Sequence, residues 1–126
     1  MAVSGGMTGV YSGTYVCSQR QMSMQLELDA SAAPTAAAVF TFYSPGGNAE
    51  SPLGAFRMSG NVDSDSGTLR LAPGDWVKRA VLYTPVGLSG TYDSRASTIT
   101  GSITGPGCTT FQVTRDETAS ARAAAA

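Results

Sequence analysis

The sequence predicts an all-β domain, an antiparallel up-and-down barrel of eight or nine strands, with a coiled β-sandwich as the alternative. Two observations lead to this prediction. Apolar and polar residues alternate along most of the chain, as they do in strands with one buried face. Clusters of Gly, Pro, Asp and Ser interrupt these runs at nearly regular intervals, as turns do between antiparallel strands. The length of 126 residues suits a single domain with a substantial core.

The clearest alternation lies in two segments. Between Met22 and Asp29 every second residue is Met or Leu, and the residues between them are polar. Between Phe56 and Val62 the same period of two recurs, with Arg57 on the polar face. This pattern predicts half-buried strands. We expect one common buried face, which includes Leu26, Phe40, Phe42, Phe56 and Met58.

The expected strands, in chain order, cover residues 10–18, 22–29, 37–43, 56–62, 68–71, 77–83, 86–93, 98–104 and 108–115. Turn signals separate them at 45–48, 63–67, 73–75, 93–95 and 105–107. The barrel domain therefore spans residues 10–115. We expect a flexible N-terminus over residues 1–9 and a mobile, alanine-rich tail over residues 116–126.

Glycine recurs within the expected strands, at Gly13, Gly60, Gly90 and Gly101, each preceded by Ser or Thr. At the last three positions the glycine shares a face with its apolar neighbours. Glycine there lets a strand coil tightly or lets another backbone approach closely. We expect these residues to curve the barrel, with close approach of a ligand as the alternative.

Cys17 and Cys108 form a disulfide or remain two free thiols. A bridge would join the first strand to the last, but the alternation places the two side chains on opposite faces if Tyr15 and Phe111 are both inward. A β-bulge near Cys108 would remove this conflict. We predict the disulfide, a buried Tyr15 and irregular pairing between Gly107 and Thr110. A disulfide implies a periplasmic or secreted protein, and free thiols imply a cytoplasmic one.

Composition narrows the possible chemistry. The chain has no histidine, which excludes histidine-based triads, metal sites and haem ligation. Eight basic and nine acidic residues leave a net charge of −1, which argues against nucleic acid or a membrane surface as partner. No apolar run approaches the length of a membrane span. We therefore expect no enzyme activity, no metal, no cofactor, no nucleic-acid partner and no membrane span.

Candidate binding residues are aromatic or basic. Trp76 follows a turn signal, where it could plug the barrel end or stack on a ligand, and Lys78 and Arg79 follow as the densest basic spot. The other candidates are a cation expected to face away from the apolar side and three amphipathic rings suited to a rim or an interface: Arg57, Tyr43, Tyr83 and Tyr92.

Three short patterns resemble known families. Gly13 and Tyr15 on the first strand, followed by repeats such as Ser89-Gly90-Thr91-Tyr92, resemble the calycin group of lipocalins and avidins, which implies a small ligand-carrying barrel. The segment 89–92 is also similar to the Ser-Gly-x-x-Tyr element in the inhibitory loop of bacterial periplasmic lysozyme inhibitors. The segments 13–17, 71–76 and 105–111 resemble an accessory module appended to bacterial multidomain proteins, which implies a non-catalytic recognition role.

The apolar face carries enough side chains to fill an eight-stranded barrel, so we expect a filled or nearly filled core. That expectation favours a non-catalytic module that recognises a protein or another macromolecule through its outer surface and loops. One alternative is a calycin-like carrier of a small apolar ligand in the barrel mouth. The other is a protein inhibitor of a cell-wall hydrolase.

The buried face can be tested by mutation. Phe56→Ala should lower the free energy of unfolding by about 3–5 kcal/mol, because the substitution removes apolar contacts and leaves a cavity. Arg57→Ala, one residue along on the other face, should change it by less than about 0.5 kcal/mol. Chemical denaturation measures both, and a Phe56→Ala loss below about 1 kcal/mol would mean that the face is wrongly assigned.

Overall fold

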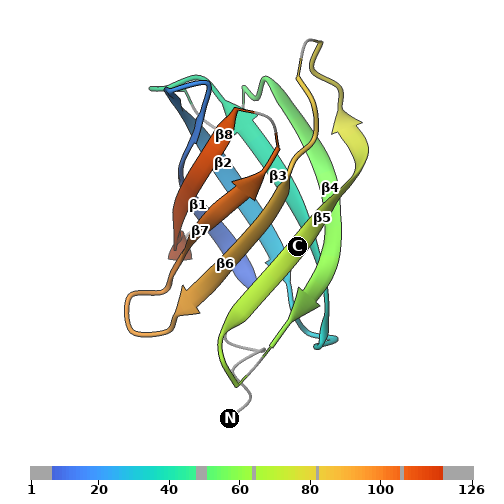
Figure 1. Ribbon diagram of the computed structural model, residues 1–126, viewed down its shortest axis with the longest axis vertical. Helices are drawn as coiled ribbons and strands as arrows, with labels where there is room; N and C mark the ends of the chain where they lie inside the picture. The colour runs from blue at the N-terminus through green and yellow to red at the C-terminus, as the bar shows by residue number, and fades with distance from the viewer. Residues whose placement is uncertain (1–6, 48–50, 64, 82, 106, 118–126) are drawn as a thin grey trace.

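Eight antiparallel strands close into a barrel in the computed structural model, which describes residues 7–47, 51–63, 65–81, 83–105 and 107–117 (Figure 1). Each strand pairs with the next along the chain, and the first pairs with the last. The predicted up-and-down barrel is therefore confirmed. The strands are β1 (Gly9–Cys17), β2 (Arg20–Asp29), β3 (Thr35–Tyr43), β4 (Gly54–Val62), β5 (Thr68–Lys78), β6 (Gly87–Asp93), β7 (Thr98–Thr104) and β8 (Cys108–Arg115).

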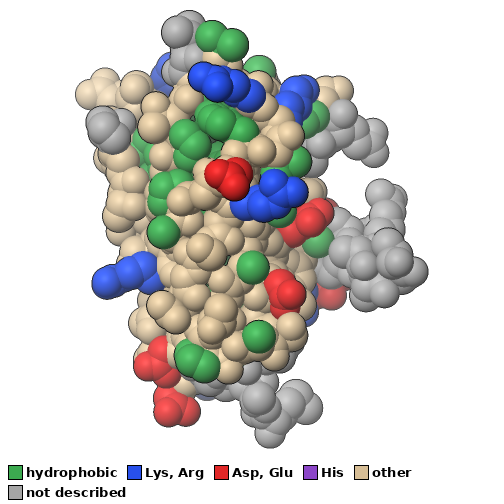
Figure 2. Space-filling model, turned by 90° about the vertical axis from the view of Figure 1, so that its right-hand side faces the viewer, with side chains coloured by type: hydrophobic (Ala, Val, Ile, Leu, Met, Phe, Trp, Pro, Cys, Tyr) green, Lys and Arg blue, Asp and Glu red, His purple; other side chains and the backbone are tan. Residues whose placement is uncertain are grey.

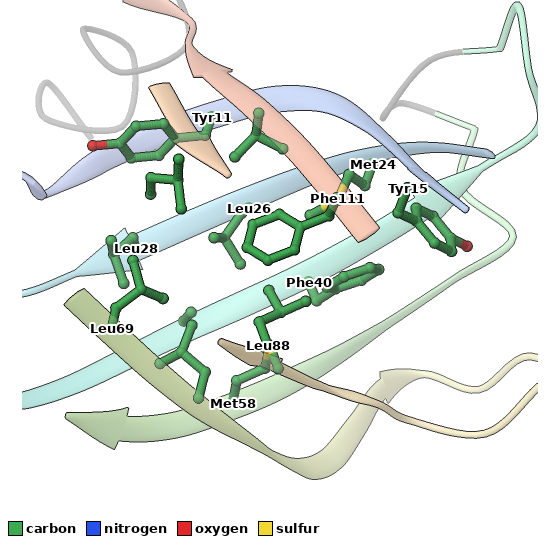
Figure 3. Packing of buried hydrophobic residues seen from close by; sticks show 14 of the residues in the cluster. Tyr11, Tyr15, Met24, Leu26, Leu28, Phe40, Met58, Leu69, Leu88 and Phe111 are labelled. Atoms are coloured by element: carbon green, nitrogen blue, oxygen red, sulfur yellow. The ribbon is translucent and has the colours of Figure 1, made fainter. Parts of the chain in front are cut away.

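The core lies inside the barrel, where the apolar residues of every strand meet (Figure 3). The side chains expected on one buried face are all buried: Leu26, Phe40, Phe42, Phe56 and Met58. Their strands pair in register, so that Leu26 lies beside Phe40 and Phe40 beside Phe56. Burial of large apolar side chains of this kind is the main stabilising contribution to a small β domain.

The turn predicted at 73–75 and the strand predicted at 77–83 are both wrong. β5 runs through the Pro-Gly-Asp segment and ends at Lys78. The register with β4 shifts twice there, so β5 absorbs its extra residues as bulges rather than as a turn. Pro73 is tolerated because this part of β5 pairs with β4 alone, while the β6 pairing stops at Leu71.

Glycine permits the tight curvature of the sheet, as expected. Gly60 faces the interior between the buried residues Met58 and Val62. A Cβ at Gly60 would collide with the backbone carbonyl of Arg70 on β5. Gly13 has the same relation to the backbone carbonyl of Gln112 on β8. The strands cross so closely at these points that no side chain fits between them.

The barrel closes where β1 meets β8, and the predicted disulfide lies there. Cys17 and Cys108 are bonded, with 91 residues separating them in sequence. Tyr15 is buried and pairs with Phe111, whereas Cys17 pairs with Cys108, so β8 holds one residue more than β1 across this interval. This irregularity confirms the predicted bulge and brings both sulfur atoms to one side of the sheet. In the chain-entropy model such a bridge stabilises the fold by about 4–5 kcal/mol.

One end of the barrel is closed by a cluster of aromatic rings and an arginine around the buried Tyr11 hydroxyl. Tyr11 is fully buried, and its hydroxyl donates a hydrogen bond of 2.6 Å to the Met7 carbonyl. The Arg115 guanidinium donates to the same hydroxyl at 3.1 Å and lies 5.4 Å from the centre of the ring. Tyr92 contacts Tyr11 edge-on, with ring centres 6.5 Å apart. The hydroxyl, the cation and the rings together seal this end.

The expected boundaries fall partly outside the described residues, which omit 1–6 and 118–126. Met7 is fully buried, and Gly9 already belongs to β1. At the other terminus the Asp116 amide donates to the Val10 carbonyl at 2.8 Å. No helix within the described ranges has the length and apolar character needed to cross a membrane.

The close crossing at Gly60 can be tested by adding one methyl group. Gly60→Ala should lower the free energy of unfolding by about 1–3 kcal/mol, because β4 and β5 must separate to admit the methyl. Ser59→Ala is the matched control, since Ser59 is exposed and the change should cost less than about 0.5 kcal/mol. Equal effects of the two substitutions in a denaturation experiment would contradict this account of the curvature.

Candidate ligand-binding site

The other end of the barrel is open and contains a cavity of about 360 Å³. Its walls come from β1, β2, β3, β4 and β8 and from the segment that joins β5 to β6. The expectation of a nearly filled core therefore holds for the closed end but not for this one. The lining residues are Tyr15, Cys17, Ser18, Arg20, Met22, Phe40, Phe42, Phe56, Tyr83, Thr84, Val86 and Cys108.

Aromatic rings form the floor and the entrance of the cavity. Phe40 and Phe56 stack with ring centres 5.0 Å apart, and Tyr15 contacts Phe40 edge-on at 5.4 Å. Tyr83 packs against Phe42 at 5.0 Å, and it is 45% exposed at the entrance. Tyr11 and Tyr15 lie at opposite ends of the core, and Tyr15 belongs to the open end (Figure 3). The other four rings are at most 6% exposed and form the floor of the cavity, so Tyr83 is the ring most open to a flat, apolar ligand.

On the side of the barrel covered by the β5–β6 segment, the pairing between β5 and β6 is incomplete. These strands pair only from Thr68 with Thr91 to Leu71 with Leu88, whereas β6 and β7 pair over seven residues. Above Leu71 β5 follows β4, and the β5–β6 segment covers the gap. Thr84 and Val86 from that segment line the cavity. The turn signal predicted at 73–75 therefore lies within β5, just beyond the point where the strand stops pairing with β6.

Few polar groups reach the cavity. The Tyr15 side chain is buried, and desolvation raises the pKa of its hydroxyl far above the usual value near 10. Like any tyrosine, this residue is protonated at neutral pH, and its hydroxyl can donate a hydrogen bond to a ligand. Ser18 and Thr84 add hydroxyls at the rim, and Arg20 is the one charged side chain among the described lining residues. An apolar ligand bearing an acceptor or a negative group fits this set.

The β1–β2 hairpin holds the rim in place. Ser18 and Gln19 both have left-handed backbone conformations, with φ of 52° and 62°, as a tight two-residue hairpin requires. The Ser18 amide donates to the Gly107 carbonyl in the β7–β8 turn at 2.6 Å. Together with the neighbouring disulfide, this bond fixes Arg20 beside the cavity.

Of the residues predicted as candidates, Tyr83 lines the cavity directly. Trp76 is half-buried behind it, edge-on to Phe56 at 5.8 Å and tilted against Phe42 at 6.3 Å, so it supports the cavity wall. Lys78 and Arg79 are exposed at the same end of the barrel, and the Lys78 ammonium donates to the Pro52 carbonyl at 2.8 Å.

The remaining candidates lie away from the cavity. Tyr92 belongs to the closed end, and the segment 89–92 is part of β6, paired with β7, rather than a loop. Tyr43 is half-buried at the end of β3. Its pKa is raised chiefly by burial and to a lesser extent by the negative charge of Asp116. Arg57 is exposed and lines an outer hollow of about 800 Å³ over β1–β4. These three residues do not form one site.

Sequence reasoning missed most of the site. Tyr15, Phe40, Phe42 and Phe56 were expected only as core residues, and Arg20 was not singled out. The alternation of apolar and polar residues showed that these side chains point inward, but it did not show which end of the barrel they leave unfilled. The position of Arg20, directly across a two-residue turn from a disulfide, was the available signal. Within the described ranges, Cys, Asp and Glu side chains form no group of three that could hold a metal ion.

The buried Tyr15 hydroxyl predicts a pH dependence of stability. The unfolded chain loses this proton near pH 10, whereas the folded protein retains it to higher pH. The unfolded state therefore binds fewer protons above pH 10, and stability that is intact below pH 10 decreases as the pH rises. Urea unfolding at about pH 11 should show a loss of about 1.4 kcal/mol from this residue. Tyr15→Phe should remove that part of the loss, and identical pH profiles would contradict the assignment.

Comparison with known proteins assigns no family to this barrel. No family model matches the chain, and no curated protein or solved structure matches it. The geometry of the cavity and the chemistry of its lining residues therefore carry the functional argument.

Proposed function

We propose that this protein is a non-catalytic binding protein that carries a small, flat, mainly apolar ligand in the mouth of its barrel. The observation that supports this most directly is the cavity of about 360 Å³ lined by five aromatic rings. Its volume lies at the lower end of the range for small-molecule sites, which favours a ligand of one to three fused or linked rings. This function replaces outer-surface recognition as the leading hypothesis.

The chemistry of the lining favours binding over catalysis. The described lining residues include no carboxylate and no free thiol, since Cys17 and Cys108 are bonded to each other. The Tyr15 hydroxyl can donate a hydrogen bond to a ligand, and its raised pKa disfavours loss of its proton further. Apolar walls with a few fixed polar groups are typical of sites that orient a ligand and release it unchanged.

The architecture supports the same proposal. Eight strands leave an interior that side chains can fill or that can hold one small ligand. Here the closed end is filled and the open end is not, which is the arrangement of a lipocalin-like carrier. The likeness to calycins at Gly13 and Tyr15 agrees with this, because both residues of β1 face the interior of the barrel. We place the protein in the periplasm or outside the cell, since the disulfide is consistent with an oxidising compartment.

A fluorescent dye tests the cavity directly. N-phenyl-1-naphthylamine is neutral, carries two aromatic units, and gains fluorescence in apolar surroundings. It should bind with a dissociation constant of about 1–10 µM, which corresponds to about −7 to −8 kcal/mol. Val86→Phe adds a ring to the cavity wall and should weaken binding at least roughly tenfold, or by about 1.4 kcal/mol.

Val77→Phe is the matched control, because it makes the same change at an exposed position of β5 outside the cavity. Its dye affinity should equal that of the wild type, and thermal denaturation should show that both variants fold. The proposal is overturned if the wild type does not bind the dye, or if the two variants bind it equally well. If the dye binds as expected, native mass spectrometry of protein from its own source would identify the natural ligand.

A further inference from the structure

The large apolar side chains that the described residues expose are concentrated at one end of the barrel. Leu53 is 36% exposed, Val77 52%, Val81 77% and Tyr83 45%. Leu53 immediately precedes β4, Val77 lies near the end of β5, and Val81 and Tyr83 lie in the segment that follows β5. This is the end at which the cavity opens. Single exposed apolar residues are ordinary on a protein surface, but four at one edge indicate an interaction site.

Local contacts join these residues into one surface. Lys78 pairs with Ala55 on β4 and donates a hydrogen bond to the Pro52 carbonyl, which holds the end of β5 against the segment that contains Leu53. The Tyr83 amide donates to the Ala80 carbonyl at 3.3 Å, which folds the following segment back over the rim. We call this surface the β5 rim, and it consists of Leu53, Val77, Val81 and Tyr83 with the cations Lys78 and Arg79.

Charge is separated along the barrel axis, although the net charge is only −1. Arg20, Lys78 and Arg79 lie at the open end, and the nearest described acid along β5 is Asp75. Figure 2 shows basic and apolar side chains gathered near the upper end of the molecule, one acidic side chain just below them, and further acidic ones at mid-height and at the lower end. At the closed end acids outnumber cations: the turns and terminus carry Asp29, Asp63, Asp65, Asp93 and Glu117, against Arg70, Arg95 and Arg115.

We propose that the β5 rim docks on a lipid bilayer that contains anionic lipids, with the mouth of the barrel facing the membrane. Apolar side chains at a protruding edge can enter the headgroup region, while adjacent cations meet the negative surface. The acidic closed end is repelled by the same surface, which orients the barrel. This proposal goes beyond the binding function: a ligand dissolved in the bilayer would pass Tyr83 into the cavity without crossing water.

Sedimentation with vesicles tests the docking. The protein should sediment with phosphatidylcholine vesicles that contain about 30 mol% phosphatidylglycerol, and much less with pure phosphatidylcholine. Lys78→Gln/Arg79→Gln should weaken the partition coefficient roughly 25-fold, about fivefold for each cation. Val81→Ser should also weaken the partition coefficient severalfold. Because the Val81 side chain is 77% exposed, this substitution should leave the fold intact.

Arg70→Gln/Arg95→Gln is the control for net charge. Both arginines are exposed and lie toward the closed end, and this variant loses the same two charges. It should bind the anionic vesicles within about twofold of the wild type. The proposal is overturned if the wild type does not bind these vesicles, if neutral vesicles bind it equally well, or if the two double variants lose the same affinity. Dye binding in the absence of vesicles is independent of all three outcomes, so this proposal and the carrier function can fail separately.

Discussion

Closure of the sheet between β1 and β8 is the constraint on which the rest of this structure depends. A sheet of eight up-and-down strands loses its exposed edges only when the first and last strands pair. That pairing must bury Tyr15 and also bring Cys17 to Cys108, which strict alternation forbids. The extra residue in β8 satisfies both requirements, since it changes the parity between Phe111 and Cys108. Once closed, the sheet encloses one interior in which Tyr15 meets Phe40.

The two ends of this interior differ in how completely side chains fill them. At the closed end the Tyr11 hydroxyl accepts a hydrogen bond from Arg115, and its ring packs against the Tyr92 ring and the Arg115 guanidinium. At the open end the rings stop short of filling the space, because β5 bends away with β4 and only the segment after it covers the gap. The same departure of β5 carries Val77 and Lys78 to the rim. The cavity and the exposed apolar edge thus have one origin in the path of a single strand.

Alternation along the chain was sufficient to predict the fold and the inward residues, because every second side chain of a strand shares a face. It predicted the disulfide and the irregularity in β8, since the parity conflict could be read from Tyr15, Cys17 and Phe111. It failed at Pro73, where a local turn signal was outweighed by pairing with β4. The site itself was out of reach: inward parity identifies which side chains meet, but the space between them depends on how the strands coil.

Net charge alone does not show where the charges of a barrel lie. A total of −1 says nothing about position, and an up-and-down barrel sends alternate turns to opposite ends. The acids of the turns at Asp63 and Asp93 cap local backbone amides, and both turns lie at the closed end. Lys78 and Arg79 occupy the other end. The dipole of the molecule is therefore a property of its topology, and an average over the composition cannot show it.

The short pairing between β5 and β6 also decides where this barrel can open. Their ladder covers residues 68–71 only, and Pro73 has no amide hydrogen to extend it. Local opening at this seam breaks fewer hydrogen bonds than opening anywhere else along the described wall, so the amide hydrogens that join residues 68–71 of β5 to β6 should exchange before the molecule unfolds as a whole. The disulfide meanwhile fastens the junction of β1 with β8. The barrel therefore has one seam fixed by a covalent bond, between β1 and β8, and one seam held by few hydrogen bonds, between β5 and β6, at which it can open.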